Sequence, residues 1–364
     1  MSATPPTFRP LDGVTVLDFS HVIAGPLASF HLARLGATVI KVEGADGDVM
    51  RRGARGMQAY NALNAGKENR QLDLRDLAQR QAAHDLAAKV DILLDNLRPG
   101  VLDRFGLGYD AVKAINPRIV YCSVSGFGRK GAWADRPAYD HVIQAMTGMM
   151  MLAGNEGDPP IKVGFPAVDA VAGLLAAFAM LAGLRERERT GSGMLLDVSM
   201  LGAAMQLMYP FTCDALTNDT SPPRLGNQGY SGSPAADLFE CREGWIAIGA
   251  NKPRHVVSLL GILGLAALGD DRAIFPDGLP LQGPASFVRA AEPARFKQAV
   301  AAAIHNWDAE TLEAALVDVQ VPAARVRRLH DFTGAFKAAP PFGLLALGED
   351  DAAVLSPGGG FAVS

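Results

Sequence analysis

An aspartate follows a proline at the start of the most apolar helical segment of the chain. Asp169 stands three residues after Pro166 and directly before the apolar run 170–184. Aspartate is a common helix N-cap, and that structural role alone would explain the residue. The helix dipole also favours an ionised carboxylate, while apolar neighbours strip it of water. A carboxylate held in this way can act as a nucleophile, so Asp169 is a candidate for covalent catalysis.

A second group of polar side chains follows a predicted strand at residues 92–95. Asn96, Arg98 and Arg104 come where that strand ends and the next helix begins. Open α/β sheets bind ligands at the carboxyl ends of their strands, so these side chains could meet phosphates or an adenine ring. Lys67 supplies a further cation for the same anion. A solvated basic loop is the alternative interpretation.

The first strands have the order of a dinucleotide-binding unit but lack its glycines. Residues 14–19 predict a strand, 27–35 a helix and 38–43 a second strand that ends in Glu43. Only Gly25 stands in the turn, whereas a dinucleotide site uses G-x-G-x-x-G to bring backbone amides onto a pyrophosphate. A dinucleotide-dependent oxidoreductase is therefore a distant alternative.

The histidines and cysteines show no metal-binding pattern. None of the seven histidines has metal-ligand spacing to another histidine or to a cysteine, so we predict no metal site. Cys122, Cys213 and Cys241 are odd in number and widely spaced, which is typical of a reducing compartment and predicts a cytoplasmic protein.

Length and charge narrow the class of protein further. The chain has 364 residues, enough for roughly two domains. It carries 34 Lys and Arg and 38 Asp and Glu, with the basic residues scattered, which argues against nucleic acid or a membrane surface as a partner. The apolar stretch 170–184 is fifteen residues long, short of the ~20 that cross a bilayer, and predicts a buried helix.

Strands and helices alternate through the first half of the chain. After residue 43 the pattern predicts a helix at 77–89, a strand at 92–95, a helix around 101–115 and a strand at 119–124. This alternation predicts an α/β fold with a Rossmann-like, mostly parallel sheet that helices cover on both faces. The candidate residues would lie on loops at its carboxyl edge.

A change in composition predicts the domain boundary. Residues 218–234 are crowded with Pro, Gly, Asn and Ser, which is typical of a linker or an active-site loop. We predict a large domain at 1–217, followed by a linker and a smaller α+β domain at 218–319. The C-terminal segment 320–364 is predicted to return to the large domain.

Six ordered motifs spread over nearly the whole chain match a known family. They are residues 11–26, 35–43, 72–74, Asn96-Leu-Arg-Pro-Gly100, 136–140 with 144–145, and 164–169. They resemble the class III coenzyme A-transferases, also called the CaiB/BaiF family. The resemblance implies a two-domain chain that forms an interlocked homodimer, with coenzyme A (CoA) bound at the large domain.

The resemblance implies that Asp169 is the nucleophile. In the family this aspartate attacks an acyl-CoA thioester to give an acyl-aspartyl anhydride, CoA then forms an aspartyl-CoA thioester, and a free carboxylic acid is acylated in turn. CoA and acyl-CoA are substrates, and no metal or tightly bound cofactor is implied. The predicted contacts to CoA are His21, Val22, Ala24, Asn96, Leu97, Arg98, Arg104, Tyr139 and Met200, together with the cation of Lys67.

A racemase branch of the family leaves an alternative open. Those enzymes move the α-proton of an acyl-CoA with a His-Asp pair in which the histidine directly precedes the aspartate. Here Tyr139 precedes Asp140, and a tyrosine of pKa about 10 is a poor base for an α-proton. His141 follows Asp140, so racemisation or epimerisation remains the alternative to CoA transfer.

Two positions depart from the pattern of some transferases. Ile23 stands where those members have a glutamine, two residues after the first-loop histidine. Gly249-Ala-Asn-Lys252 stands where they have a glycine-rich lid in the small domain. The acid specificity of those members therefore does not transfer to this chain, and residues 249–252 are a candidate lid.

Overall fold

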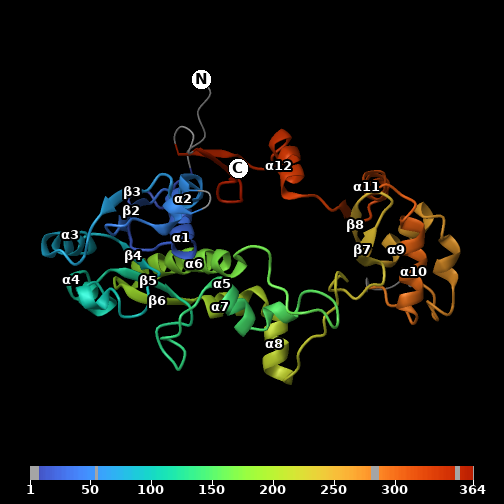
Figure 1. The fold of residues 1–364 in the computed structure, drawn as a ribbon, viewed down its shortest axis with the longest axis horizontal. Helices are drawn as coiled ribbons and strands as arrows, with labels where there is room; N and C mark the ends of the chain where they lie inside the picture. Colours follow the sequence, from blue (N-terminus) through green and yellow to red (C-terminus); the bar gives the residue numbers. More distant parts are fainter. Residues whose placement is uncertain (1–7, 54–55, 280–286, 349–352, 364) are drawn as a thin grey trace. The chain divides into compact units, whose positions relative to one another are not determined.

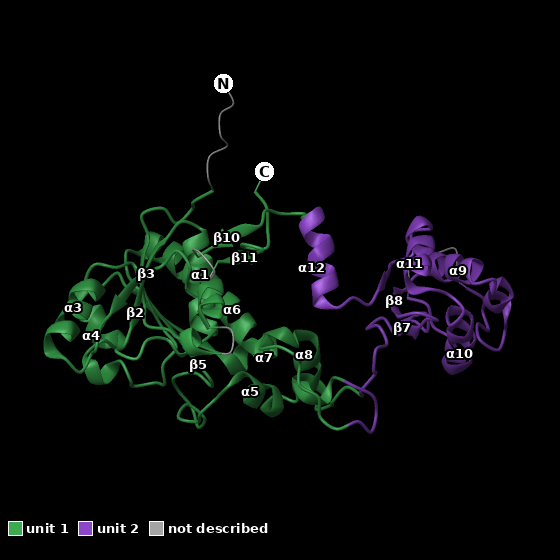
Figure 2. Ribbon diagram, turned by 45° about the horizontal axis from the view of Figure 1, so that its top comes forward, with its two compact units in different colours: residues 1–153, 159–223, 340–364 green, residues 154–158, 224–339 purple. Residues whose placement is uncertain are grey.

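The chain divides into two compact units (Figures 1 and 2). The computed structural model describes residues 8–53, 56–279, 287–348 and 353–363. Unit 1 comprises residues 1–153, 159–223 and 340–364, and unit 2 comprises residues 154–158 and 224–339. Residues 320–339, which we predicted to join the large domain, belong instead to unit 2, because β9 (Ala323–Arg325) pairs with a strand of that unit.

A six-stranded parallel sheet forms the centre of unit 1, which confirms the predicted α/β class. Its strands are β1 (Thr15–Asp18), β2 (Thr38–Glu43), β3 (Glu68–Gln71), β4 (Ile92–Asp95), β5 (Val120–Ser125) and β6 (Met194–Ser199). They lie in the order β3-β2-β1-β4-β5-β6, with every pairing parallel. The strand order reverses between β1 and β4, so the loops after these strands diverge and leave room for a ligand.

Helices cover both faces of this sheet. They are α1 (Ala24–Arg34), α2 (Gly56–Asn64), α3 (Leu77–Ala87), α4 (Tyr109–Ile115), α5 (Asp140–Met146), α6 (Ala167–Thr190), α7 (Met200–Leu207) and α8 (Tyr209–Asn218). Val16 and Ile92 pack into one core with α1 and α6, whereas their neighbours Leu17 and Leu93 pack into the other with α3 and α4. This alternation follows from the two-residue period of a strand. A C-terminal hairpin, β10 (Leu345–Leu347) with β11 (Val354–Ser356), completes unit 1.

Unit 2 is a smaller α+β unit with its own core. An antiparallel sheet is formed by β7 (Ala236–Glu240), β8 (Trp245–Gly249) and β9. Its helices are α9 (Pro253–Ile262), α10 (Pro293–Ile304), α11 (Ala309–Asp318) and α12 (Leu329–Ala338), with a short 3₁₀ helix at Ala266–Asp270. Phe239, Ile246 and Phe296 are almost wholly buried between sheet and helices.

Three elements of unit 1 differ from the sequence prediction. The predicted helix at 101–115 is interrupted, because Gly106 adopts a left-handed φ of 70° and ends the short 3₁₀ helix Asp103–Phe105 before α4 begins. The strand β3 was not predicted, since all four of its residues are exposed and polar. The helix α2 before it was not predicted either.

Helix α6 is longer than the apolar run that predicted it. Its 24 residues are long and apolar enough to cross a membrane by length and composition alone, but half of the apolar window is buried inside the protein. The core helices of soluble proteins pass the same test. Its buried side packs against α1, and a Cβ at Gly173 would lie only 2.7 Å from the Ala24 carbonyl oxygen, so the glycine permits this close approach.

Candidate active site

One cavity at the carboxyl edge of the parallel sheet gathers almost all the predicted site residues. This main cavity has a volume of about 610 Å³, within the usual range of ligand pockets. Its wall is formed by the loops after β1 and β4, the loop between β5 and α5, and the starts of α6 and α7. The predicted residues on that wall are His21, Val22, Ala24, Asn96, Leu97, Arg98, Arg104, Tyr139, Asp169 and Met200.

Lys67 is not among the residues that line the main cavity, and its contact with CoA stays a prediction. Its Nζ lies 3.3 Å from Asp18 Oδ2 and donates to the Pro26 carbonyl at 2.9 Å, and the lysine side chain is only 1% exposed. Burial lowers the pKa of Lys67 to about 8, although the charge of Asp18 opposes that shift. The lysine therefore contacts the first turn of α1 through the Pro26 carbonyl.

The first loop, residues 19–23 between β1 and α1, is held by one side chain to the second loop, residues 96–108 between β4 and α4. Asn96 Oδ1 accepts from the His21 backbone N–H at 2.9 Å, and Asn96 Nδ2 donates to the His21 carbonyl at 2.7 Å. The next residue, Val22, has a φ of 66°, which is uncommon for a β-branched residue. The two loops therefore form one continuous part of the cavity wall. Burial lowers the pKa of the His21 imidazole, so the ring is neutral at pH 7.

The second loop carries two exposed cations. Arg98 and Arg104 both lie on the wall of the main cavity with their residues exposed. Within the described part of the chain, neither guanidinium has a carboxylate partner within 4.0 Å, the distance that defines an ion pair. Both are therefore available to an anionic ligand such as a phosphate.

Asp169 lies in the first turn of α6, but it is not the N-cap. The N-cap is Pro166, and the helix begins at Ala167. The free N–H groups at this helix start are satisfied instead by Asp140 of α5, whose Oδ2 accepts from Val168 at 2.7 Å and from Asp169 at 3.1 Å. The N-cap interpretation of Asp169 is therefore wrong, and its carboxylate has no hydrogen-bond or ion-pair partner among the described residues.

The surroundings of Asp169 make its carboxylate more basic than usual. Burial and the neighbouring charge of Asp140 raise the pKa of Asp169 from 3.8 to about 6. The carboxylate is still mostly ionised at pH 7, and its higher basicity favours attack on an electrophilic carbon. A partly desolvated, unpaired anion on the wall of a cavity is a suitable nucleophile.

The loop before α5 brings a ring and a further cation to the cavity. Tyr139 is 70% exposed, and its ring lies parallel to that of His141 with centroids 6.4 Å apart. Arg136 lies on the wall as well, although we did not single it out in the sequence. Its position in the same motif as Tyr139 was the available signal. His141 is not among the residues that line the main cavity.

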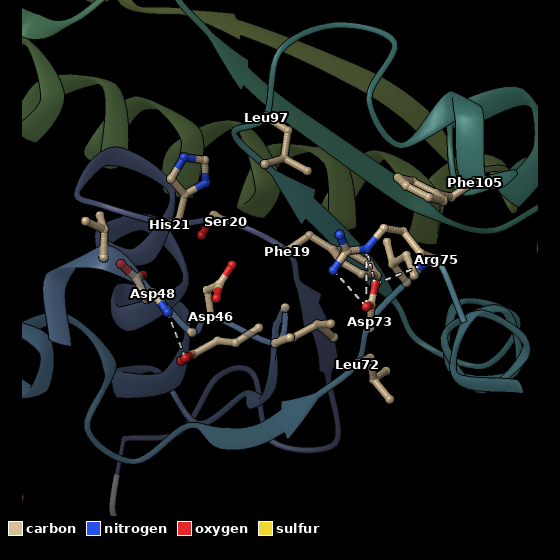
Figure 3. A pocket seen from close by; sticks show the side chains of 17 residues that line it. Phe19, Ser20, His21, Asp46, Asp48, Leu72, Asp73, Arg75, Leu97 and Phe105 are labelled. Atoms are coloured by element: carbon tan, nitrogen blue, oxygen red, sulfur yellow. Dashed lines mark hydrogen bonds and ion pairs between the residues drawn. The ribbon is translucent and has the colours of Figure 1, made fainter. Parts of the chain in front are cut away.

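A second cavity adjoins the main one (Figure 3). It has a volume of about 500 Å³ and shares His21 and Leu97 with the main cavity. Its wall combines apolar side chains such as Phe19, Leu72 and Phe105 with the carboxylates of Glu43, Asp46, Asp48 and Asp73. The cation of Arg75 is paired with Asp73 at 2.9 Å. The two cavities together follow the carboxyl edge of the sheet across β2, β1 and β4.

The candidate lid, residues 249–252, belongs to the smaller unit. Gly249 ends β8 and Lys252 is the N-cap of α9, so residues 249–252 lie in unit 2.

In the described ranges, no group of three or more His, Cys, Asp or Glu side chains is placed to hold a metal ion.

Comparison with known proteins identifies the family of the chain. The model of CoA-transferase family III matches residues 11–339. A succinyl-CoA:glutarate CoA-transferase from Mus musculus is 32% identical over 302 residues, which cover 81% of this chain and 69% of the relative. An acetyl-CoA:oxalate CoA-transferase from Acetobacter aceti is 36% identical over 269 residues, which cover 72% of this chain and 69% of the relative.

A solved structure shares the fold over nearly the full length. A CAIB/BAIF family protein from Brucella suis superposes with a TM-score of 0.79 at 29% identity, and the match covers 91% of this chain and 88% of the other. The family match extends over both units and includes the motifs that line the main cavity. The chain therefore belongs to CoA-transferase family III, the class III CoA-transferases.

Proposed function

We propose that this CoA-transferase uses Asp169 as the nucleophile that carries first the acyl group and then CoA. The observation that supports the proposal most strongly is the Asp169 carboxylate itself. It lies on the wall of the main cavity, half-buried, unpaired among the described residues, and with its pKa raised to about 6. Such a carboxylate retains its charge at neutral pH while losing much of the hydration that would weaken its attack.

The proposed reaction needs no group beyond this carboxylate, CoA and the two acids. An Asp169 oxygen attacks the thioester carbonyl of the donor, the C–S bond breaks, and CoA leaves as the thiolate. The thiolate attacks the Asp169 carbonyl of the resulting anhydride and releases the donor acid as a carboxylate. The acceptor carboxylate then displaces the thiolate from aspartyl-CoA, and thiolate attack on the acceptor's acyl carbon regenerates Asp169. Thioester energy is retained throughout because no intermediate is hydrolysed.

The rest of the main cavity supports binding of the CoA arm. Arg98 and Arg104 are exposed cations that suit the diphosphate, and the second cavity has room for the nucleotide end. In this proposal, His21, Val22 and Ala24 contact the part of the CoA arm that lies between the diphosphate and Asp169. In this proposal CoA and acyl-CoA are substrates, and no cofactor stays bound between turnovers.

The acids are proposed to be small carboxylic acids, with dicarboxylic acids first in order of test. The mouse and Acetobacter relatives are named for succinyl-CoA with glutarate and for acetyl-CoA with oxalate. Arg136 adds a third guanidinium to the cavity wall, which supports recognition of a second carboxylate.

We also propose that the protein is a cytoplasmic homodimer that does not bind a membrane, with the interlocked arrangement that the family resemblance implies. Large apolar side chains are exposed on unit 1, among them Phe178 of α6 at 69% and Leu216 of α8 at 74%. Exposed apolar side chains of this size often mark protein interfaces. Light scattering of the full chain should give twice the 38.3 kDa of one copy, and a monomer would contradict the dimer.

Covalent trapping tests the proposed nucleophile. The protein is incubated with succinyl-CoA, glutarate and hydroxylamine, and the modified residue is located by mass spectrometry. A hydroxamate on Asp169 is expected, and none on Asp140 or in Asp169→Asn. If transfer proceeds in the parent while Asp169 stays unmodified, another nucleophile carries the reaction.

Racemisation is tested in a separate incubation. Incubation of a branched acyl-CoA in heavy water would introduce deuterium at the α-carbon if the chain moved an α-proton. We expect no deuterium, because His141 does not line the main cavity. Deuterium exchange without modification of Asp169 would favour the racemase alternative.

A further inference from the structure

Four charged side chains are enclosed directly beneath the first loop of the main cavity. Lys41 Nζ lies 3.3 Å from Asp48 Oδ2, and Lys67 Nζ lies 3.3 Å from Asp18 Oδ2. Each of these side chains is at most 1% exposed. Burying an ion pair costs desolvation energy that an apolar pair would not, so buried pairs are weak evidence for stability alone. We call these four residues the buried tetrad.

The tetrad holds the backbone of the first loop at successive points. Lys41 Nζ donates to the Ser20 carbonyl at 2.6 Å. Asp18 Oδ1 accepts from the Ser20 backbone N–H at 2.8 Å, and Asp48 Oδ1 accepts from the Val22 N–H at 3.5 Å. The charges therefore bind the peptide groups on both sides of His21.

The loop needs such support because of its own conformation. Val22 adopts a left-handed φ of 66°, which is strained for a β-branched residue and persists only where surrounding contacts hold it. Residues 21–24 line the main cavity, and His21 and Asp48 both line the second cavity (Figure 3). Any relaxation of Val22 would move the residues that lie on the proposed path of CoA.

We propose that Lys41 is a positioning residue, which with Asp48 holds the first loop in its strained conformation and thereby sets the affinity for CoA. Lys41 is wholly buried and lines neither cavity, so its effect must pass through the Ser20 carbonyl and the loop. The inference rests on the proposed function for the identity of the ligand, but the effect on the loop does not depend on it.

Two variants separate positioning from stability. Lys41→Met leaves Asp48 as an unpaired buried charge and should lower both the melting temperature and the affinity for CoA. In Lys41→Met/Asp48→Asn no unpaired charge remains in this pair, so the melting temperature should recover most of its loss. The Ser20 carbonyl still lacks its donor, so the KM for acyl-CoA should stay about tenfold or more above that of the parent, with kcat within about twofold.

A partly buried ion pair at the amino end of the parallel sheet serves as the control. Arg187 Nη1 lies 3.0 Å from Asp91 Oδ1, next to the start of β4 and away from both cavities. Arg187→Met should lower the melting temperature while KM stays at the parent value. If both the melting temperature and the KM of the Lys41/Asp48 double variant return to the parent values, the tetrad affects KM only through stability and the proposal is wrong.

Hydrogen exchange of the loop amides gives a readout that does not require CoA. In the double variant, peptides covering residues 18–26 should exchange faster than in the parent at equal melting temperature, and exchange in the control should be unchanged. Unchanged exchange in the double variant would overturn the inference. Failure of the parent to bind CoA by calorimetry would instead overturn the proposed function, and the exchange data would still decide the role of Lys41.

Discussion

Asp140 holds the backbone of Asp169 and at the same time raises the pKa of its carboxyl group. One oxygen of Asp140 accepts the N–H of Asp169 at 3.1 Å and that of Val168 at 2.7 Å. After burial, the charge of Asp140 is the second cause of the raised pKa of Asp169. A single carboxylate thus caps α6, orients the proposed nucleophile and increases its basicity.

The pH dependence of transfer should report this relationship. Because the nucleophile is the anion, kcat/KM in the parent should fall about tenfold per pH unit below the Asp169 pKa of about 6. Asp140→Asn keeps an oxygen that can accept a hydrogen bond but removes the charge, so the acid limb should move to lower pH. The measurement is the pH profile of kcat/KM for succinyl-CoA with glutarate.

Asp85→Asn is the control for that profile, since Asp85 is exposed on α3 and accepts from Gln81, far from α6 in the sequence. Its acid limb should coincide with that of the parent. An acid limb in Asp140→Asn that also coincides with the parent's would show that Asp140 does not influence ionisation of the nucleophile.

The raised pKa of Asp169 also predicts that the protein becomes more stable to unfolding when this carboxylate is replaced by a neutral amide. Between its ordinary pKa of 3.8 and its folded pKa of about 6, the folded state binds more protons than the unfolded state, so stability falls as pH rises through this window. Asp169→Asn should therefore raise the free energy of unfolding at pH 8 by on the order of 2 kcal/mol and leave it nearly unchanged near pH 3.5.

Chemical denaturation at both pH values measures this difference, and the same variant should lose CoA transfer by about 10³-fold or more. A variant that is less stable than the parent at pH 8 would mean that the ionised Asp169 makes a favourable contact, contrary to its position on the cavity wall.

The parallel sheet was predictable because its central strands are apolar on both faces. Strands β1, β4 and β5 are buried between two layers of helices and stand out as short apolar runs. The edge strand β3 has only exposed polar residues and carries no such signal. The placement of residues 320–339 in unit 2 depends on pairing of β9 with β8, a contact between distant segments that composition does not encode.

The site was predictable where short motifs carry it, and not where contacts between distant segments decide it. Asn96 and Arg98 are two residues apart in one motif, and both line the main cavity. Lys67 has the same charge as Arg98, but it is buried in an ion pair with Asp18. Because Asp18 is 49 residues away in the sequence, this pairing could not be predicted from the local motif. The contact of Asp140 with Val168 spans 28 residues, so the capping of α6 could not be inferred from either segment alone.

Replacing Gly25 even by alanine should lower the stability of the protein and weaken binding of acyl-CoA. A Cβ at this position would lie 2.2 Å from Ser20 Cβ and 3.3 Å from Asn96 Cγ, so Gly25→Ala must push the first loop away from the second. We expect a loss of stability of about 1–3 kcal/mol and a KM for acyl-CoA raised about tenfold. Thermal unfolding and steady-state kinetics measure the two effects.

Gly261→Ala provides the comparison, because Gly261 lies in α9 and nothing stands within 4 Å of an added Cβ. That variant should gain up to about 1 kcal/mol from higher helix propensity, with unchanged kinetics. Equal KM values in the two glycine variants would show that the first loop does not need its observed contact with Asn96.

Arg104 should contribute to binding of CoA rather than to the chemical step. Its guanidinium is exposed on the cavity wall, and a charge-assisted hydrogen bond to a phosphate is worth about 1.5–3 kcal/mol. Arg104→Met should therefore raise the KM for acyl-CoA roughly 10- to 100-fold with kcat nearly unchanged, and should weaken the dependence of KM on salt. In the control Arg185→Met, which removes an 83% exposed side chain paired with Glu188, neither constant should change. If Arg104→Met leaves KM and its salt dependence at parent values, the phosphates of CoA do not bind at the second loop, and the proposed binding mode of CoA is wrong.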